Sequence, residues 1–251
     1  MKKVSLGIAA VAALIGTPAL AADIALKAPC CATPVYNWTG FYGGLNAGAS
    51  WGQAGNTFNF VPTGVAPAFI ASDSSHPAGF IGGGQLGYNW QVNTVVLGLE
   101  TDVQGSTQRA SATAPGLATT CAGCSVSETD KLTWFGTTRG RIGLASDGWL
   151  PYVTGGVAYA GVQSNGTQPV PGISVVPTLG GSTVRTGWTV GGGLEAALSG
   201  RWTWKVEYLY MNLGTANFTT SSPTPPFAPG SFTQSMSVTD SIVRGGVNLR
   251  Y

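Results

Sequence analysis

Three short groups of residues have types and spacings that could support chemistry. Gly82, Gly84 and Gly87 match the G-x-G-x-x-G spacing of dinucleotide-binding loops. That motif needs a helix to follow at once, because the helix N-terminus holds the pyrophosphate. Here the next residues, 88–91, continue a two-residue alternation. The glycines are therefore interpreted as positions of close strand packing, and no cofactor is expected.

The second group is Asp73-Ser74-Ser75-His76, which holds the residue types of a Ser–His–Asp hydrolase and the only histidine of the chain. Members of a triad must converge in space, with the base about 3 Å from the nucleophile. Residues adjacent in one loop seldom converge in this way. A solvated loop histidine is the favoured interpretation, no catalytic residue is predicted, and a lipid-modifying enzyme at the rim of the fold is a minor alternative.

The third group is the cysteines. Cys121 and Cys124 have a C-x-x-C spacing that in a reducing cytosol would suggest metal or redox work. Outside the inner membrane a small local disulfide between them is expected instead. Cys30 and Cys31 are adjacent and poorly placed to bond to each other, so intermolecular pairing and free thiols both remain open. The architecture argued below places the two pairs on opposite sides of a membrane, and no metal site is expected.

A larger set of ionisable residues lies in segments where apolar and polar residues alternate, and there the charged residues take the polar positions. In "VVLGLETDVQ", for example, Leu97 and Leu99 have one parity and Glu100 and Asp102 the other. A basic side chain facing lipid at mid-bilayer costs about 2–4 kcal/mol, so the charged parity is assigned to an enclosed lumen. Such buried charges must be paired, either as a stabilising plug or as a narrow ion path. The predicted lumen network contains Glu100, Asp102, Arg139, Arg141, Glu195, Lys205, Glu207, Arg244 and Arg250.

The elements that position this network are eight segments with strand periodicity. They cover residues 41–52, 80–91, 95–104, 132–145, 151–162, 187–198, 201–211 and 241–251. In the fourth segment Leu132 and Trp134 share the outward parity. The connections alternate in length: long ones at 53–79, 105–131, 163–184 and 214–237, and short ones at 92–94, 146–148 and 199–200. The pattern predicts an all-β, eight-stranded, antiparallel, up-and-down transmembrane β-barrel with long extracellular loops and both termini in the periplasm.

Composition supports an exported membrane protein. Lys2 and Lys3, an apolar run at 4–15 and the small residues Ala19 and Ala21 predict a signal peptide over residues 1–21. A periplasmic segment over 22–37 and a barrel over 38–251 are expected to follow. Without the two lysines the chain has ten basic and ten acidic residues, so nucleic acid is an unlikely partner. The 38 glycines and the absence of another long apolar run also suit a barrel.

The last segment carries a further signal. Its alternating outward residues end on an aromatic side chain, as at the interfacial girdle of a barrel. This pattern resembles the assembly signal that the barrel-insertion machinery reads in outer-membrane proteins, although Tyr replaces the more usual Phe. The residues assigned to it are Val243, Val247, Leu249 and Tyr251.

Seven motifs together resemble a known family. They are "NWTGFYGGLNAG", "GFIGGGQLGYNWQ", "LGLETDVQGS", "WFGTTRGRIG", "LPYVTGGVAY", "GWTVGGGLEAAL" and "KVEYLYMNLG". The family is the small outer-membrane barrel (porin-like) proteins of rhizobia and related alpha-proteobacteria, similar in plan to the transmembrane domain of outer membrane protein A. The cysteines and the loop sequences depart from it.

The resemblance implies a cell-outer-membrane location and roles in envelope integrity, surface antigenicity and loop-mediated contact, with no catalysis. Outer-membrane lipid and lipopolysaccharide are the implied partners, and no oligomeric state is implied. A diffusion porin for small solutes is the alternative. It would need a trimer or more strands, because eight strands enclose too little space for an open aqueous channel.

Overall fold

The computed structural model describes residues 36–62, 69–115, 125–167, 178–222 and 230–251. Among these residues no helix is long and apolar enough to cross a membrane. The strands are β1 (Gly40–Pro62), β2 (Phe69–Ser75), β3 (Ala78–Val92), β4 (Val95–Ser106), β5 (Arg109–Pro115), β6 (Ser125–Leu144), β7 (Trp149–Thr167), β8 (Thr178–Ala197), β9 (Trp202–Ser222) and β10 (Gly230–Arg250).

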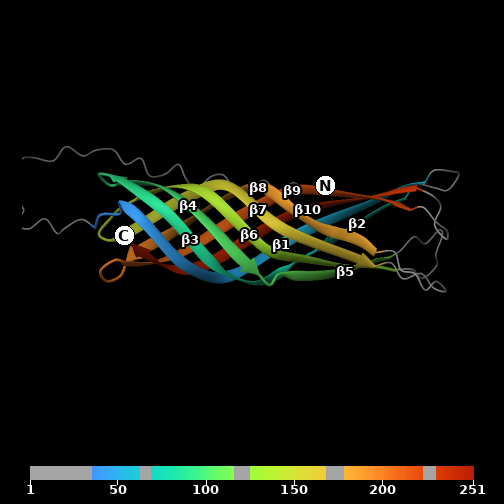
Figure 1. The fold of residues 1–251 in the computed structure, drawn as a ribbon, viewed down its shortest axis with the longest axis horizontal. Coiled ribbons are helices and arrows are strands. Elements are labelled where there is room, and N and C mark those ends of the chain that lie inside the picture. The colour runs from blue at the N-terminus through green and yellow to red at the C-terminus, as the bar shows by residue number, and fades with distance from the viewer. Residues whose placement is uncertain (1–35, 63–68, 116–124, 168–177, 223–229) are drawn as a thin grey trace, which may run out of the picture. The chain divides into compact units, whose positions relative to one another are not determined.

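The strands close into an antiparallel barrel (Figure 1). Their order is β2-β1-β10-β9-β8-β7-β6-β4-β3-β5, and a further pairing of β1 with β3 joins the two edges. β2 pairs with β1 and β5 pairs with β6, so these two short strands continue the walls begun by β3 and β4. The predicted eight-stranded, up-and-down barrel is therefore confirmed.

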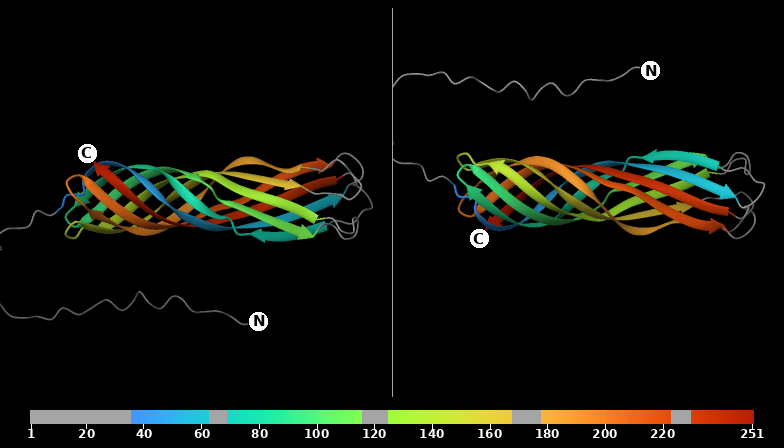
Figure 2. Two further views of the ribbon diagram at one scale, coloured as in Figure 1. Left: turned by 90° about the horizontal axis from the view of Figure 1, so that it is seen from below. Right: turned by 90° about the horizontal axis from the view of Figure 1, so that it is seen from above.

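The two ends of the barrel differ. Tyr42 pairs with Arg250, so the start of β1 and the end of β10 lie together at what we call the terminal end. Figure 2 shows the C-terminus there, beside the blue start of β1. The opposite end is called the loop end. At the terminal end the short predicted turns are confirmed, and Asn93, Asp147 and Gly200 have the positive φ angles that tight hairpins require.

Side chains alternate between the two faces of the wall. In β4, Glu100 and Asp102 are buried, whereas Leu97, Leu99 and Val103 are exposed on the outside. Exposed aromatic residues form two girdles on this outer face. The terminal-end girdle contains Phe41, Tyr88, Trp90, Trp149, Trp202 and Tyr251, and the loop-side girdle contains Trp51, Phe80, Trp134 and Trp188. An apolar band between aromatic girdles is the surface that a bilayer requires.

The strands continue far beyond the loop-side girdle, and the predicted extents of the long connections were wrong. β1 runs to Pro62 and β9 to Ser222, while β6 begins at Ser125 and β10 at Gly230. Outside the bilayer the outer face of a wall meets water, so pairing persists there without the apolar outer face that reveals the other segments. Polar cross-strand contacts accompany it, such as Ser111 Oγ to Thr129 Oγ1 at 3.3 Å.

One predicted side-chain direction was also wrong. Leu132 was placed outward with Trp134, but Leu132 is buried and Trp134 is exposed. The register between β6 and β7 shifts between these two residues, which adds one residue to β6. Such a bulge reverses the parity of everything beyond it, so Leu132 faces the interior.

Candidate functional site

Eight buried ionised side chains are linked in the lumen between the two girdles, and Arg139 lies at their centre. Its Nη2 lies 2.5 Å from Glu100 Oε1 and 3.0 Å from Asp102 Oδ2. Its Nη1 donates to Glu207 Oε1 at 2.8 Å. One guanidinium thus joins three carboxylates, because the charged side chains of β4, β6 and β9 all point into the lumen.

Arg244 and Lys205 add two more cations to this cluster. Arg244 Nε donates to Glu207 Oε2 at 2.8 Å, and its Nη2 donates to Asp102 Oδ2 at 2.8 Å. Lys205 Nζ lies 2.8 Å from both carboxylate oxygens of Glu100. The side chains in these contacts are at most 2% exposed, so the charges are shielded from solvent and must satisfy one another.

A second arm of the network is built around Glu195. Arg141 donates from Nη1 to Glu195 Oε2 at 2.9 Å and from Nε to Asn89 Oδ1 at 2.9 Å. Glu195 Oε1 accepts from Thr203 Oγ1 at 2.6 Å and from Asn248 Nδ2 at 2.9 Å. This arm connects β3, β6, β8, β9 and β10 across the lumen.

The network is balanced, with four acidic and four basic members. Each carboxylate accepts hydrogen bonds from three different side chains. Buried ions hydrogen-bonded in this way cross-link the strands that carry them. The structure therefore brings together Glu100, Asp102, Arg139, Arg141, Glu195, Lys205, Glu207 and Arg244 of the predicted set.

Two tyrosines that were not predicted as site residues complete the network. Tyr42 Oη donates to Glu100 Oε2 at 2.8 Å, and Tyr152 Oη donates to Glu207 Oε1 at 3.0 Å. The Arg141 guanidinium lies 4.8 and 5.1 Å from the two ring centroids, which adds cation–π attraction. Their inward parity was the available signal, since an aromatic hydroxyl turned into a polar lumen needs a partner.

Gly87 provides the space for Tyr42. A Cβ at position 87 would overlap the Tyr42 hydroxyl group, whereas a Cβ at Gly84 would meet nothing closer than 3.5 Å. We expect Gly87→Ala to displace Tyr42 from Glu100 and to lower the free energy of unfolding by about 1–3 kcal/mol. Gly84→Ala, in the same strand, should change it little. Urea unfolding in lipid vesicles would measure both, and equal losses in the two variants would contradict the assignment.

Arg250 was predicted as a network member but lies apart from it. Its Nη2 donates to the carbonyl oxygen of Thr39 at 3.0 Å, and its guanidinium lies 4.9 Å from the Tyr36 ring and 5.6 Å from the Trp38 ring. Strand parity identified the face correctly. It carries no information about depth along the barrel, and Arg250 lies too near the terminal end to reach the carboxylates.

Apolar residues close the lumen on both sides of the network. Inside β9 and β10, Glu207 and Arg244 are followed on the loop side by Leu209 and Ile242, both 0% exposed. At the terminal end, Trp38 packs with Val96, Ala145 and Leu150. The loop-side apolar cluster contains Ala54, Ile81, Leu132, Phe135, Ala158, Ala160, Val162, Leu209, Met211, Leu213, Met236, Val238 and Ile242. The sequence pattern did not reveal this layer, because only the charged residues marked the inward face of each strand.

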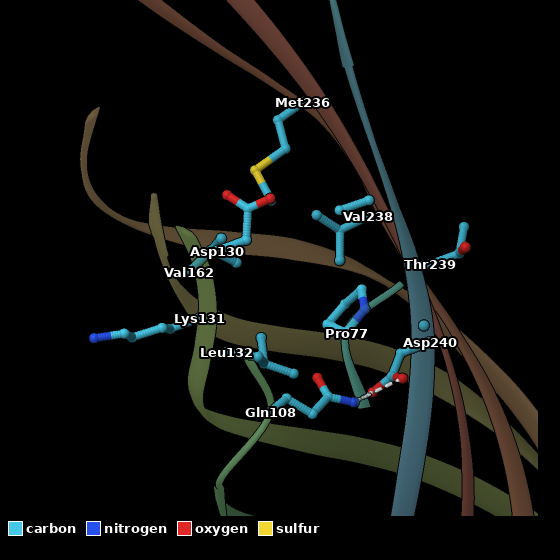
Figure 3. Close-up of a pocket in the computed structure, with 12 residues that line it drawn as sticks. Pro77, Gln108, Asp130, Lys131, Leu132, Val162, Met236, Val238, Thr239 and Asp240 are labelled. Atoms are coloured by element: carbon cyan, nitrogen blue, oxygen red, sulfur yellow. Dashed lines mark hydrogen bonds between the residues drawn. The ribbon is translucent and has the colours of Figure 1, made fainter. Parts of the chain in front are cut away.

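Two further carboxylates are buried on the loop side. Gln108 Nε2 lies 2.9 and 3.0 Å from the two Asp240 carboxylate oxygens, and Ser75 Oγ donates to Asp130 Oδ2 at 3.2 Å. Neither carboxylate has a salt bridge among the residues that the structure describes. Both line a cavity of about 20 Å³ (Figure 3), which is room for about one water molecule and not for a solute.

The hydrolase-like group does not converge. Asp73, Ser74 and Ser75 belong to β2 and not to a loop, and Ser75 is buried with its hydroxyl directed to Asp130. Ser74 and His76 are exposed. Strand alternation thus sends the two serines to opposite faces, and no nucleophile–base pair forms from this segment.

The remaining predicted residues are placed as follows. Gly82, Gly84 and Gly87 lie within β3 and are followed by more strand, so the helix that a dinucleotide site needs is not there. Val243, Val247 and Tyr251 are on the outer face of the barrel, and Leu249 is partly exposed. Within the described residues no group of three or more His, Cys, Asp and Glu side chains could hold a metal ion. All four cysteines and residues 1–21 lie outside the described residues.

Comparison with known proteins identifies the family. The family model described as "Outer membrane protein beta-barrel domain" matches residues 7–226. The chain belongs to this family. Among other family proteins, it is 40% identical over 223 residues to the 31 kDa outer-membrane immunogenic protein of Brucella melitensis, covering 86% of this chain and 89% of that one.

Two further similarities concern a curated relative and a solved structure. The 22 kDa outer membrane protein of Rhizobium leguminosarum bv. viciae is 31% identical over 179 residues, covering 70% of this chain and 65% of that one. The solved structure of the outer membrane protein OprG from Pseudomonas aeruginosa aligns with a TM-score of 0.49 at 11% identity, covering 85% of this chain and 97% of that one. The predicted resemblance to rhizobial and related outer-membrane barrels is confirmed.

Proposed function

We propose that this outer-membrane barrel is a closed, non-catalytic protein with a structural and surface role. It stabilises the envelope as a cross-linked cylinder and displays its loop end outside the cell. The termini face the periplasm, residues 1–21 direct export, and the outward alternation that ends at Tyr251 is read by the barrel-insertion machinery. The last three statements rest on the sequence pattern.

The filled lumen is the observation that carries this proposal. The ion pairs around Arg139 occupy the interior between the girdles, the apolar cluster that includes Phe135 and Leu209 lies on their loop side, and Trp38 packs at the terminal end. An ion crossing this interior would have to displace paired charges and then pass the buried apolar cluster.

Planar-bilayer recording tests the closed lumen. The purified full chain is expected to give no stable conductance steps, because side chains fill an eight-stranded barrel. Phe135→Gly would remove the largest apolar side chain on the loop side of the network, and the ion pairs should still block current in this variant. Stable steps in the wild-type protein whose size changes in Glu100→Gln or Arg139→Gln would overturn the proposal in favour of a pore.

The loop-end extension supports a role at the cell surface. Strands such as β9 and β10 carry backbone well past the loop-side girdle, so a substantial part of the barrel projects beyond the bilayer. The related Brucella proteins are named immunogenic, and we extend a surface-antigen role to this chain from that similarity. Exposed side chains on this extension include Thr215, Asn217 and Thr219 as well as Val61 and Ile70, so it presents both polar and apolar groups for contact.

Thiol labelling tests the orientation. In a background with all four native cysteines changed to serine, Ser74→Cys at the loop end should react with a membrane-impermeant maleimide on intact cells. Asp147→Cys, exposed in a turn at the terminal end, should react only after the outer membrane is permeabilised. The reverse pattern would place the termini outside and remove the surface role of the extension.

A further inference from the structure

Among the residues whose side chains the structure describes, the outer face of the barrel near the loop-side girdle has charge of only one sign. Asp147 lies in a turn at the terminal end, whereas the acidic wall residues with described side chains share the inner face, including Asp73, which pairs directly with buried Asn56. Among wall residues whose side chains the structure describes, the inward acids are Asp73, Glu100, Asp102, Asp130, Glu195, Glu207 and Asp240. Arg109 and Lys131, by contrast, lie on the outer face.

Arg109 and Lys131 are directly opposite each other in the ladder between β5 and β6. Directly opposed residues have Cβ atoms about 4.5–5.5 Å apart, and like charges in that position repel. Neither side chain has a salt bridge within the described part of the chain. Figure 3 shows the Lys131 ammonium pointing away from the cavity that Asp130 and Asp240 line, so these buried acids do not neutralise it.

The pair adjoins the edge of the apolar band. Trp51 opposes Ala78, Ala78 opposes Arg109, and Lys131 opposes Gln163, so these residues form one outward row across five neighbouring strands. Phe80, two residues from Ala78, and Trp51 are exposed members of the loop-side girdle. The two cations therefore lie where a bilayer changes from acyl chains to headgroups. Their neighbours in the row are the small residue Ala78 beside Arg109 and the polar residue Gln163 beside Lys131.

We propose that Arg109 and Lys131 form a binding site for the phosphate groups of a phosphorylated glycolipid of the outer leaflet. The guanidinium fork matches two phosphate oxygens, the ammonium adds a second charged donor, and the bound anion removes the repulsion between the two cations. Trp51 and Phe80 pack against the acyl chains of the same lipid. This inference rests on the proposed orientation, because only then does the loop end meet the outer leaflet.

Lipid titration of the full chain in detergent micelles tests the site. The probes are a bisphosphorylated diglucosamine lipid and the same lipid without its phosphates, with binding followed by native mass spectrometry. The double variant Arg109→Gln/Lys131→Gln should bind the phosphorylated lipid at least about tenfold more weakly, a loss of about 1.4 kcal/mol, because it removes both charged donors. Arg201→Gln, which changes an exposed cation at the terminal end, should bind like the wild-type protein.

Each other outcome is decisive. Unchanged binding by the double variant, an equal loss in Arg201→Gln, or an equal loss for the lipid without phosphates would overturn the site. Heat-modifiable migration on a gel confirms folding of each variant, and the conservative variant Arg109→Lys/Lys131→Arg should retain most binding if the double variant is unstable. Because the titration in micelles does not depend on orientation, its failure leaves the proposed function intact. Inverted thiol labelling would instead remove the outer-leaflet assignment together with the surface role of the extension, and would leave phosphate binding in micelles unchanged.

Discussion

Arg139→Leu is expected to lower the free energy of unfolding by about 3–5 kcal/mol, because breaking a buried ion pair leaves uncompensated charge. Here the loss is concentrated, since Glu100, Asp102 and Glu207 all bond to this one guanidinium. Leucine cannot donate to any of them, and the remaining cations would have to serve four carboxylates. Equilibrium urea unfolding in lipid vesicles, followed by tryptophan fluorescence, would measure the loss.

Arg250→Leu is the matched control for this variant. It makes the same chemical change in an arginine of the same parity that lies outside the network, and a loss of about 1 kcal/mol is expected for its hydrogen bond. The double variant Arg139→Leu/Asp102→Asn should recover part of the stability, because it removes one unpaired carboxylate. If Arg139→Leu and Arg250→Leu were equally mild, the network would not stabilise the barrel.

Asp240→Asn is expected to stabilise the protein at about pH 8 by on the order of 2–4 kcal/mol. Asp240 pairs with Gly52, one residue beyond girdle residue Trp51, and so lies just outside the membrane-spanning band. Burial raises the pKa of Asp240 from 3.8 to about 7, although a hydrogen bond from Gln108 acts in the opposite direction. The apolar neighbours Leu132 and Val238, which line the same cavity, cannot solvate an ionised carboxylate there.

The sign of the pH dependence follows from that pKa. Between about pH 4 and pH 7 the folded protein keeps Asp240 protonated while the unfolded chain ionises it, so folding takes up a proton and stability falls as pH rises. Above about pH 7 the full penalty remains. Asp240→Asn should abolish this slope and match the wild-type protein at about pH 4. Unfolding curves across this range would show it, and an unchanged slope would exclude Asp240 as the source.

Asp147→Asn is the control for Asp240→Asn. Asp147 is exposed in a terminal-end turn with φ of 44°, a conformation that asparagine also tolerates. The same loss of one carboxylate should there leave the pH slope unchanged. A similar shift in both variants would indicate a general effect of net charge.

Much of the fold was predictable because lipid imposes a strict rule on each transmembrane strand. One face must be apolar, so Leu97 and Leu99 alternate with Glu100 and Asp102, and the parity of each strand is visible in the chain. The short turns were equally predictable, because only two or three residues separate one alternating segment from the next. The strand extensions past the loop-side girdle were not predictable, because water replaces lipid at the outer face there and an apolar outer face is no longer required.

By itself the sequence determined the closed antiparallel barrel, the inward direction of its charges and the apolar exterior, because all three follow from the cost of placing charge in hydrocarbon. Only the tertiary structure decided which charges meet. It left Arg250 outside the network, brought in Tyr42 and Tyr152, and turned Leu132 inward at a bulge. Which charged side chains meet depends on their depth along the barrel axis and on the stagger between neighbouring strands. The alternation of residues along a single strand gives information on neither.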